Sequence, residues 1–189
     1  MIASPTKIPG LLSISLTRHG DARGFFAEIY NQKSYSRAGI ETLFVQDNHS
    51  VSEFSGTVRG LHYQSPPQAQ AKLVRCGRGS LFDVAVDIRI GSPTYGQWHG
   101  EVLSSENGRQ LYIPAGFAHG FMTLEDDTEI VYKCSDFYAP ECEGAVRFDD
   151  PDISIEWPQI DGSAIISEKD MRANMLRDMV SPFSFEAVS

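Results

Sequence analysis

The chain has 189 residues, of which 41% are hydrophobic, and a formal net charge of -9. A chain of this length can bury a sizeable core. We therefore predict a single domain over residues 1–189, with its core at about 5–160 and a C-terminal helical segment at about 167–180. The acidic balance argues against nucleic acid or a membrane surface as the main partner, because both favour basic proteins.

The cysteines and the N-terminal residues both favour a reducing, cytoplasmic compartment. Cys76, Cys134 and Cys142 form no regular disulfide pattern, so we expect reduced thiols. Residues 1–16 lack the positive region and apolar core of a signal peptide. No window approaches the roughly 18 apolar residues of a membrane span. We therefore expect a soluble, cytoplasmic protein.

Two segments carry helix signals. Asn31 opens NQKSYSRAGI, a short helix pattern that Gly39 is placed to end. Ser167 opens SEKDMRANMLRDM, the stronger pattern. Ser167 can cap this helix, and the acidic Glu168 and Asp170 lie in its first turn.

The sequence between these helices predicts short strands separated by Gly, Pro, Asn and Asp. LFDVAVDI alternates imperfectly, so we expect it to be buried on both faces. Many short strands with a late helix predict a mainly β fold, either a β-sandwich or a closed barrel with room for one small ligand. The strand-like segments are KLVRCGRGSLFDVAVDIR (two strands joined at Gly77 to Gly79), GQWHGEVLS, RQLYIP, GFMTL and TEIVYKCSDFY.

A histidine and a lysine flank a proline-rich turn. Side chains alternate along a strand, so His62 and Gln64 share one face. Gly60 favours a bulge, which would bring Arg59 to the same side. Lys72 opens the next strand, and a lysine on an inward face needs an anionic partner.

Two spacings resemble the motifs of cupin barrels. The second cupin motif is a glycine followed by a proline, a glycine and a histidine after gaps of five, one and two residues. It is matched here by Gly108, Pro114, Gly116 and His119. Gly56 and His62 have the five-residue gap of the first motif. Together they refine the fold prediction to a cupin-like jelly-roll with a few short helices.

His62 has three possible roles: a buried core residue, a metal ligand or a general base. A metal-binding cupin carries a second histidine where Gln64 stands, and two nitrogens alone make a poor zinc or iron site. We therefore predict no metal. The core role stays open. However, Arg59, Lys72 and His119 are candidates for the same cavity, and such a set favours an anionic or carbonyl-bearing ligand.

The sequence resembles the dTDP-4-dehydrorhamnose 3,5-epimerase family over nearly the whole chain, from about Asp21 to Asp170. The resemblance implies a dTDP-linked 4-keto-6-deoxy sugar as substrate. Its C3 and C5 would be epimerised through an enolate, with neither metal nor cofactor. The matching segments are DARGFFAEIYN, FVQDNHS, TVRGLHYQSPPQAQAKLVR, LFDVAVDIR, GSPTYGQW, LYIPAGFAHGF, VYKCSDFYAPE and SEKD.

The resemblance also implies catalytic roles. His62 is the base, and Asp170 fixes its tautomer and stabilises the imidazolium. Tyr132 is the proton donor on the opposite face of the sugar. Lys72 stabilises the enolate oxygen.

The implied substrate contacts come from two subunits. Arg23, Phe26 and Glu28 would be contributed by the neighbouring subunit of a homodimer with strand exchange near the N-terminus. The remaining implied contacts are Gln46 and Asn48 at the nucleotide, Tyr138 near the base or sugar, and Arg59 and His119 beside the keto sugar. We further expect Asp83, on LFDVAVD, to lie near Arg59 and His119 and to balance the charge of Lys72.

Some residues depart from the family pattern, and alternatives remain. Phe148 stands in CEGAVRFDD where the family often has a tryptophan. The alternatives are a 3-only or 5-only epimerase of another nucleotide-linked 4-keto-deoxysugar, a non-catalytic sugar-nucleotide-binding cupin, and a metal-dependent cupin enzyme.

Overall fold

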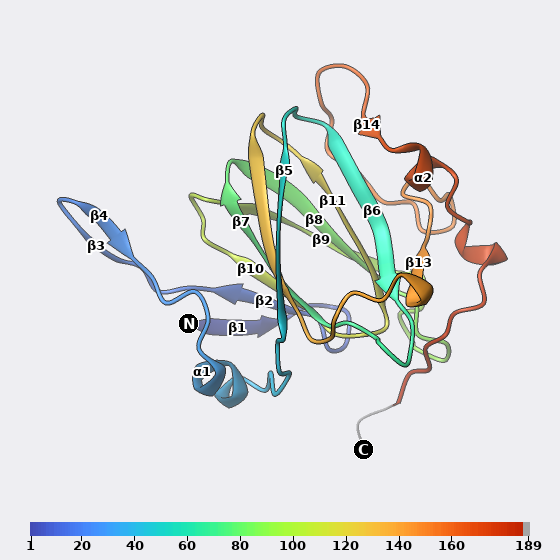
Figure 1. The fold of residues 1–189 in the computed structure, drawn as a ribbon, viewed down its shortest axis with the longest axis horizontal. Coiled ribbons are helices and arrows are strands. Elements are labelled where there is room, and N and C mark those ends of the chain that lie inside the picture. The colour runs from blue at the N-terminus through green and yellow to red at the C-terminus, as the bar shows by residue number, and fades with distance from the viewer. Residues whose placement is uncertain (187–189) are drawn as a thin grey trace.

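A computed structural model describes residues 1–186, which form two facing β-sheets (Figure 1). This arrangement confirms the predicted mainly β sandwich. The first sheet has the strand order β1 (Ile2–Pro5), β2 (Leu12–Ser15), β10 (Gln110–Ile113), β7 (Lys72–Arg78), β12 (Thr128–Cys134) and β5 (Gln46–Ser52). The second has the order β13 (Glu143–Ala145), β6 (Thr57–Gln64), β11 (Phe117–Thr123), β8 (Ser80–Asp87) and β9 (Trp98–Ser104), and β14 (Ile165–Ile166) pairs in parallel with β6.

Strand β8 is buried on both faces, as its sequence predicted. Leu81 and Ala85 face the first sheet and join the core between the sheets. Val84 and Val86 belong to a second cluster on the outer face, which includes Ile153 from the segment that follows β13. Each such aliphatic side chain contributes about 1.5–3 kcal/mol through burial, so both layers stabilise the second sheet.

The predicted bulge lies in β6. Its pairing with β11 shifts register, because His62 pairs with His119 while Arg59 pairs with Phe121. Three steps along β6 therefore match two steps along β11, which turns Arg59 and His62 to the same side. Gly60 has a φ of 123°, and a Cβ there would lie 2.5 Å from the Cα of Gly120. Only glycine permits this approach of the two strands.

The two helix predictions differ in outcome. Helix α1 (Gln32–Arg37) is capped by Asn31, as predicted. Helix α2 (Glu168–Met171) has the expected Ser167 cap, but the expected continuation is wrong because the helix ends at Met171. The chain then forms a β-bridge from Asn174 to Val146 before the 3-10 helix η2 (Leu176–Asp178). Tertiary pairing here overrides local helix propensity. Another 3-10 helix, η1 (Pro140–Cys142), precedes β13.

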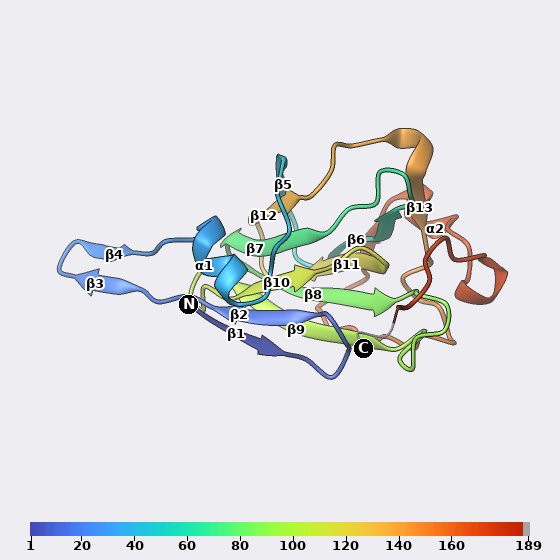
Figure 2. The same ribbon diagram turned by 90° about the horizontal axis from the view of Figure 1, so that it is seen from below.

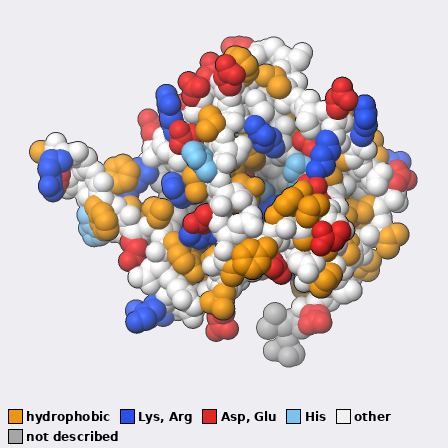
Figure 3. Space-filling view, in the orientation of Figure 1, with side chains coloured by type: hydrophobic (Ala, Val, Ile, Leu, Met, Phe, Trp, Pro, Cys, Tyr) orange, Lys and Arg blue, Asp and Glu red, His pale blue; other side chains and the backbone are white. Residues whose placement is uncertain are grey.

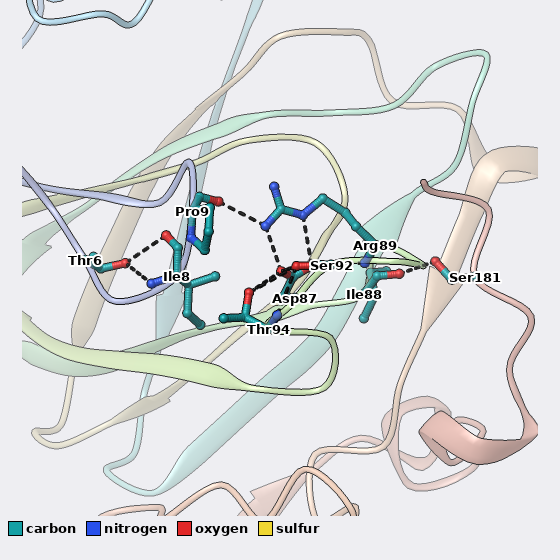
Figure 4. A network of polar contacts seen from close by, with 9 residues as sticks. All are labelled: Thr6, Ile8, Pro9, Asp87, Ile88, Arg89, Ser92, Thr94 and Ser181. Atoms are coloured by element: carbon teal, nitrogen blue, oxygen red, sulfur yellow. Dashed lines mark hydrogen bonds and ion pairs between the residues drawn. The ribbon is translucent and has the colours of Figure 1, made fainter. Parts of the chain in front are cut away.

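The end of the sandwich far from β14 is held by a buried ion pair (Figure 4). Arg89 Nη2 donates to Asp87 Oδ2 at 2.7 Å, and Ser92 and Thr94 donate to the same oxygen. Burial alone would raise the pKa of Asp87, but these hydrogen bonds hold it below its ordinary value. The Arg89 guanidinium also lies 4.9 Å from the ring centre of Phe185, which ties the C-terminal segment to this end.

Strands β3 (His19–Asp21) and β4 (Gly24–Phe26) form a hairpin that projects away from both sheets (Figure 2). Phe25 and Phe26 are exposed, Phe26 to 70%. An arm of this kind buries little surface within its own chain. Within residues 1–186, no helix has the length and apolar character needed to cross a bilayer.

Candidate active site

A cavity of about 510 Å³ opens between the two sheets, close to β14 and α2. Lys, Arg and His side chains gather around the hollow on this face (Figure 3). Among the predicted site residues, it is lined by Arg59, His62, Lys72, His119, Tyr132 and Asp170.

The pair of His62 and Asp170 joins two distant parts of the chain. Strand β6 presents His62 to the cavity, and α2 places the carboxyl of Asp170 against it. His62 Nε2 lies 2.6 Å from Asp170 Oδ1, and the Asp170 residue is only 3% exposed. Asp170 Oδ2 also accepts a hydrogen bond from the backbone N–H of Gly60 at 3.4 Å. Because Nε2 is bonded to a carboxylate, Nδ1 is the nitrogen left to accept a proton.

Lys72 begins β7 and lines both this cavity and the one beside it. Burial lowers the pKa of its ammonium, while the thiol of Cys134 and the carboxylate of Asp83 act in the opposite direction. Its Nζ donates a long hydrogen bond of 3.5 Å to the carbonyl oxygen of His62. A weakly partnered ammonium in a partly buried site can stabilise negative charge that develops on a bound ligand.

Tyr132 lines the cavity from the opposite sheet. It lies on β12 of the first sheet, whereas His62 lies on β6 of the second. Burial raises the pKa of the Tyr132 phenol, so the group stays protonated near neutral pH. The cavity therefore has a potential base on one wall and a potential proton donor on the other.

His119 and Asp83 form a second buried pair behind the cavity. His119 Nε2 lies 2.8 Å from Asp83 Oδ1, and both side chains are almost fully buried. Burial lowers the pKa of His119, although Asp83 partly opposes this effect. Arg59 is held at the rim by Ser52 and by the carbonyl oxygen of Val51.

A second cavity of about 360 Å³ adjoins the first and shares His62, Lys72 and Tyr132 with it. It contains three predicted ligand contacts, Gln46, Asn48 and Tyr138. The side chains of Gln46 and Asn48 are hydrogen-bonded to each other at 3.0 Å. Two joined cavities suit a ligand with two parts.

Four of the predicted contacts line neither cavity within one chain. Asp83 is fully buried and bonded to His119, and the other three lie outside both sheets. Arg23 lies at the tip of the β3–β4 hairpin, with its side chain 89% exposed and paired with Asp21. Phe26 and Glu28 line a separate surface hollow beside α1. The resemblance assigned Arg23, Phe26 and Glu28 to a neighbouring subunit, and that assignment stays a prediction.

The sequence analysis missed Glu143 and Lys169. Lys169 Nζ lies 2.6 Å from Glu143 Oε2, and the Tyr138 hydroxyl donates to the same oxygen at 3.4 Å. This ion pair spans the boundary of the two cavities, because Lys169 lines the first and Glu143 lines the second. The position of Lys169 next to Asp170 was the one available signal in the sequence.

Gln64, which stands where metal-binding cupins carry a second histidine, has a structural role. Its amide nitrogen donates to the carbonyl oxygens of Gln68 and Phe137, and its oxygen accepts from the N–H of Ala139. It thus joins two loops. In the described part of the chain, no three His, Cys, Asp or Glu side chains gather as a metal-binding group.

The protein is a β-sandwich whose cavity has a carboxylate-bonded histidine on one wall and a phenol on the other. These features are those of a proton-transfer enzyme with a cupin-like fold. The comparisons narrow this class. The model of the dTDP-4-dehydrorhamnose 3,5-epimerase family matches residues 5–178. The dTDP-4-dehydrorhamnose 3,5-epimerase of Pseudomonas aeruginosa is 51% identical over 179 residues, which cover 94% of this chain and 97% of the relative.

Solved structures give the same result. A dTDP-6-deoxy-D-glucose-3,5-epimerase from Legionella pneumophila, in complex with dTDP-4-keto-L-rhamnose, has a TM-score of 0.93 at 46% identity and covers 98% of this chain and 99% of its own. A 3'-monoepimerase from Streptomyces bikiniensis, in complex with dTDP-quinovose, has a TM-score of 0.86 at 39% identity, with 92% and 87% covered. The chain belongs to the dTDP-4-dehydrorhamnose 3,5-epimerase family and is an isomerase of sugar nucleotides.

Proposed function

We propose that the protein converts dTDP-4-dehydro-6-deoxy-D-glucose into dTDP-4-dehydro-L-rhamnose by inverting C3 and C5. One observation carries this proposal: His62, bonded to Asp170, and Tyr132 line one cavity from opposite sheets. Inversion at carbon requires removal of a proton from one side and delivery of a proton to the other. Two groups on facing walls meet this requirement.

In the proposed mechanism, Nδ1 of His62 removes the proton on C5 or C3, and the C–H electron pair forms the enolate with the C4 carbonyl. Asp170 stabilises the resulting imidazolium. The Tyr132 hydroxyl then delivers its proton to the opposite face of the same carbon. The histidine releases its proton to solvent and the phenolate takes one up, so the net reaction is an isomerisation.

The negative charge that forms on the C4 oxygen is the main obstacle in this reaction. We assign Lys72 the role of stabilising that oxygen. Burial lowers the pKa of its ammonium, and a nearby anion would offset the free-energy cost of burying that charge. His119, held by Asp83, and Arg59 are proposed to bind the keto sugar beside it. The second cavity, with Gln46, Asn48 and Tyr138, would hold the nucleotide.

A 3-only or 5-only epimerase is the second candidate function. Its support is the 3'-monoepimerase from Streptomyces bikiniensis, which shares the fold at 39% identity. Both reactions require a base and an acid on opposite faces of the sugar, so their presence alone does not decide how many carbons are inverted. A non-catalytic binding protein would not need the paired His62 and Asp170.

Solvent proton exchange tests these alternatives. In deuterium oxide, we expect the wild type to place deuterium at both C3 and C5 of the keto sugar, as read by NMR. His62→Asn should lower exchange at both carbons about 10²–10⁴-fold, the usual contribution of a general base. His99→Asn, outside both cavities, is the matched control. Exchange with inversion at one carbon alone would establish a monoepimerase, and nucleotide binding without any exchange would refute the catalytic proposal.

The proposal includes a homodimer in which Arg23, Phe26 and Glu28 of one subunit complete the site of the other. Its support is the projecting β3–β4 hairpin (Figure 2), whose second strand carries the exposed Phe25 and Phe26. It also includes the cytoplasmic location predicted from the sequence. The three free cysteines, all buried, agree with a reducing compartment.

A further inference from the structure

The helix that carries Asp170 is too short to hold its own position. Helix α2 has four residues, Glu168–Met171, and isolated helices shorter than about 12 residues are marginal in water. The orientation of the Asp170 carboxyl therefore depends on how the chain is held on each side of α2. On the N-terminal side, Ile165 and Ile166 pair with β6, the strand that carries His62.

On the C-terminal side, the chain is held by a turn that follows β13. Arg147 N donates to the carbonyl oxygen of Asn174 at 2.9 Å. Asp150 adds a stronger contact, because its Oδ2 accepts the backbone N–H of Leu176 at 2.6 Å. The other oxygen, Oδ1, accepts the N–H groups of Asp152 at 2.7 Å and Ile153 at 3.2 Å.

Asp150 is only 1% exposed, and both of its oxygens are bonded to backbone. One oxygen shapes its own turn, while the other holds the segment that follows α2. Hydrogen bonds to a carboxylate are shorter and stronger than neutral ones, and loss of the acceptor leaves a buried N–H without a partner. The Leu176 side chain packs in the same cluster as Val146 and Ile153. Leu176 is therefore held through its backbone by Asp150 and through its side chain by this cluster.

We propose that Asp150 is a positioning residue: through residues 171–176 it holds the Asp170 carboxyl at hydrogen-bonding distance from His62. Asp150 lines neither cavity and so does not touch the substrate. The inference rests on the proposed function only in giving the pair of His62 and Asp170 its catalytic meaning.

Asp150→Asn tests this role with little change of shape. The amide keeps one acceptor for the turn but places an N–H₂ group against the N–H of Leu176. Asp149→Asn is the matched control, since Asp149 is the neighbouring residue and pairs with the side chain of Arg147. NMR of the protein with ¹⁵N-labelled histidine reports the proton shared between His62 Nε2 and Asp170. We expect this downfield, exchange-protected signal in the wild type and Asp149→Asn, and its loss in Asp150→Asn and Asp170→Asn.

Kinetics provide the second measurement. Asp150→Asn should lower kcat about tenfold to a hundredfold through misplacement of a catalytic group, with little change in KM. In the Asp170→Asn background, the same substitution should change the rate by no more than about twofold, because its effect passes through Asp170. An equal loss in both backgrounds, or an unchanged His62 signal in Asp150→Asn, would overturn the proposal.

Two safeguards keep the test decisive. If Asp150→Asn does not fold, Leu176→Pro removes the same hydrogen bond from the donor side, because proline has no backbone N–H and Met175 already has the extended backbone that precedes a proline. An unchanged His62 signal in Leu176→Pro also overturns the proposal. The NMR signal needs no substrate. A lost signal in Asp150→Asn combined with an inactive wild type would therefore refute the proposed function and leave the positioning role standing.

Discussion

Subunit complementation tests whether the projecting hairpin completes the neighbouring site. Two variants are needed, each defective in a different component. Arg23→Ala removes a proposed substrate contact on the hairpin, and His62→Asn removes the proposed base. In one chain these residues lie on separate structural units, since Arg23 is 89% exposed at the hairpin tip and His62 lines the cavity between the sheets.

The expected activities follow from which subunit supplies Arg23 and which supplies His62 to each site. Loss of a charge-assisted hydrogen bond costs about 1.5–3 kcal/mol, so Arg23→Ala should retain roughly 1–10% of wild-type kcat/KM. His62→Asn should retain about 1% or less. In a mixed dimer, the subunit with intact His62 receives intact Arg23 from its partner, while the other site lacks both. Random pairing makes about half of the dimers mixed, so about one quarter of wild-type activity should return.

The two variants are co-expressed with different tags, and turnover is compared with each parent alone. Size-exclusion chromatography with light scattering checks that dimers form. Wild type co-expressed with His62→Asn is the control, and it should give about half of the wild-type activity, counting wild-type and variant chains together. If Arg23 serves its own subunit, no mixed dimer has a complete site. Activity at the mean of the two parents would then refute the exchanged arm.

Three further predictions concern single side chains. Lys72→Met should lower kcat about 10²–10³-fold, because the ammonium stabilises the enolate, and should raise Tm by a few degrees, because a buried ammonium costs stability. Proton exchange by NMR measures the first effect and calorimetry the second. A lower Tm would contradict this reasoning. Tyr132→Phe should separate exchange from inversion, with deuterium uptake on the His62 side but no epimerised product. Asp87→Asn should lower Tm at pH 7 by about 6–12 °C, from about 3 kcal/mol for a broken buried pair with Arg89. Since the folded pKa of Asp87 is depressed, its stabilisation is present above the unfolded value near about 4 and is lost as pH falls through the folded pKa, so the difference in Tm should shrink in acid.

Local patterns in the sequence predicted the strands and the orientation of several site residues. Alternation put His62 and Gln64 on one face of their strand, and Gly60 indicated the bulge that turns Arg59 to the same side as His62. These features depend on neighbours along the chain. The meeting of His62 with Asp170 depends on a contact across 108 residues, and no local pattern specifies it. Only the family resemblance pointed to that pair, since the pattern alone made Asp170 a first-turn helix residue.

The early end of α2 has the same physical origin. The segment after Met171 has good helix formers, yet its backbone groups bond to the turn after β13 instead. A continued helix would carry Leu176 away from the N–H contact with Asp150 and from its buried cluster. The prediction from Ser167 onward was therefore right about the cap and wrong about the length, because long-range pairing decided the length.

The architecture itself accounts for the direction of proton delivery in the proposed reaction. A single base on one wall can remove and return a proton only on the same side of a held sugar, which gives exchange without inversion. In this sandwich, β6 and β12 belong to different sheets and both contribute to one cavity. A ring bound between them meets His62 on one side and Tyr132 on the other. The gap between the sheets thus supplies the two opposed groups that the proposed inversion needs. An anion on the bound sugar would offset the burial that lowers the pKa of Lys72 in the same gap.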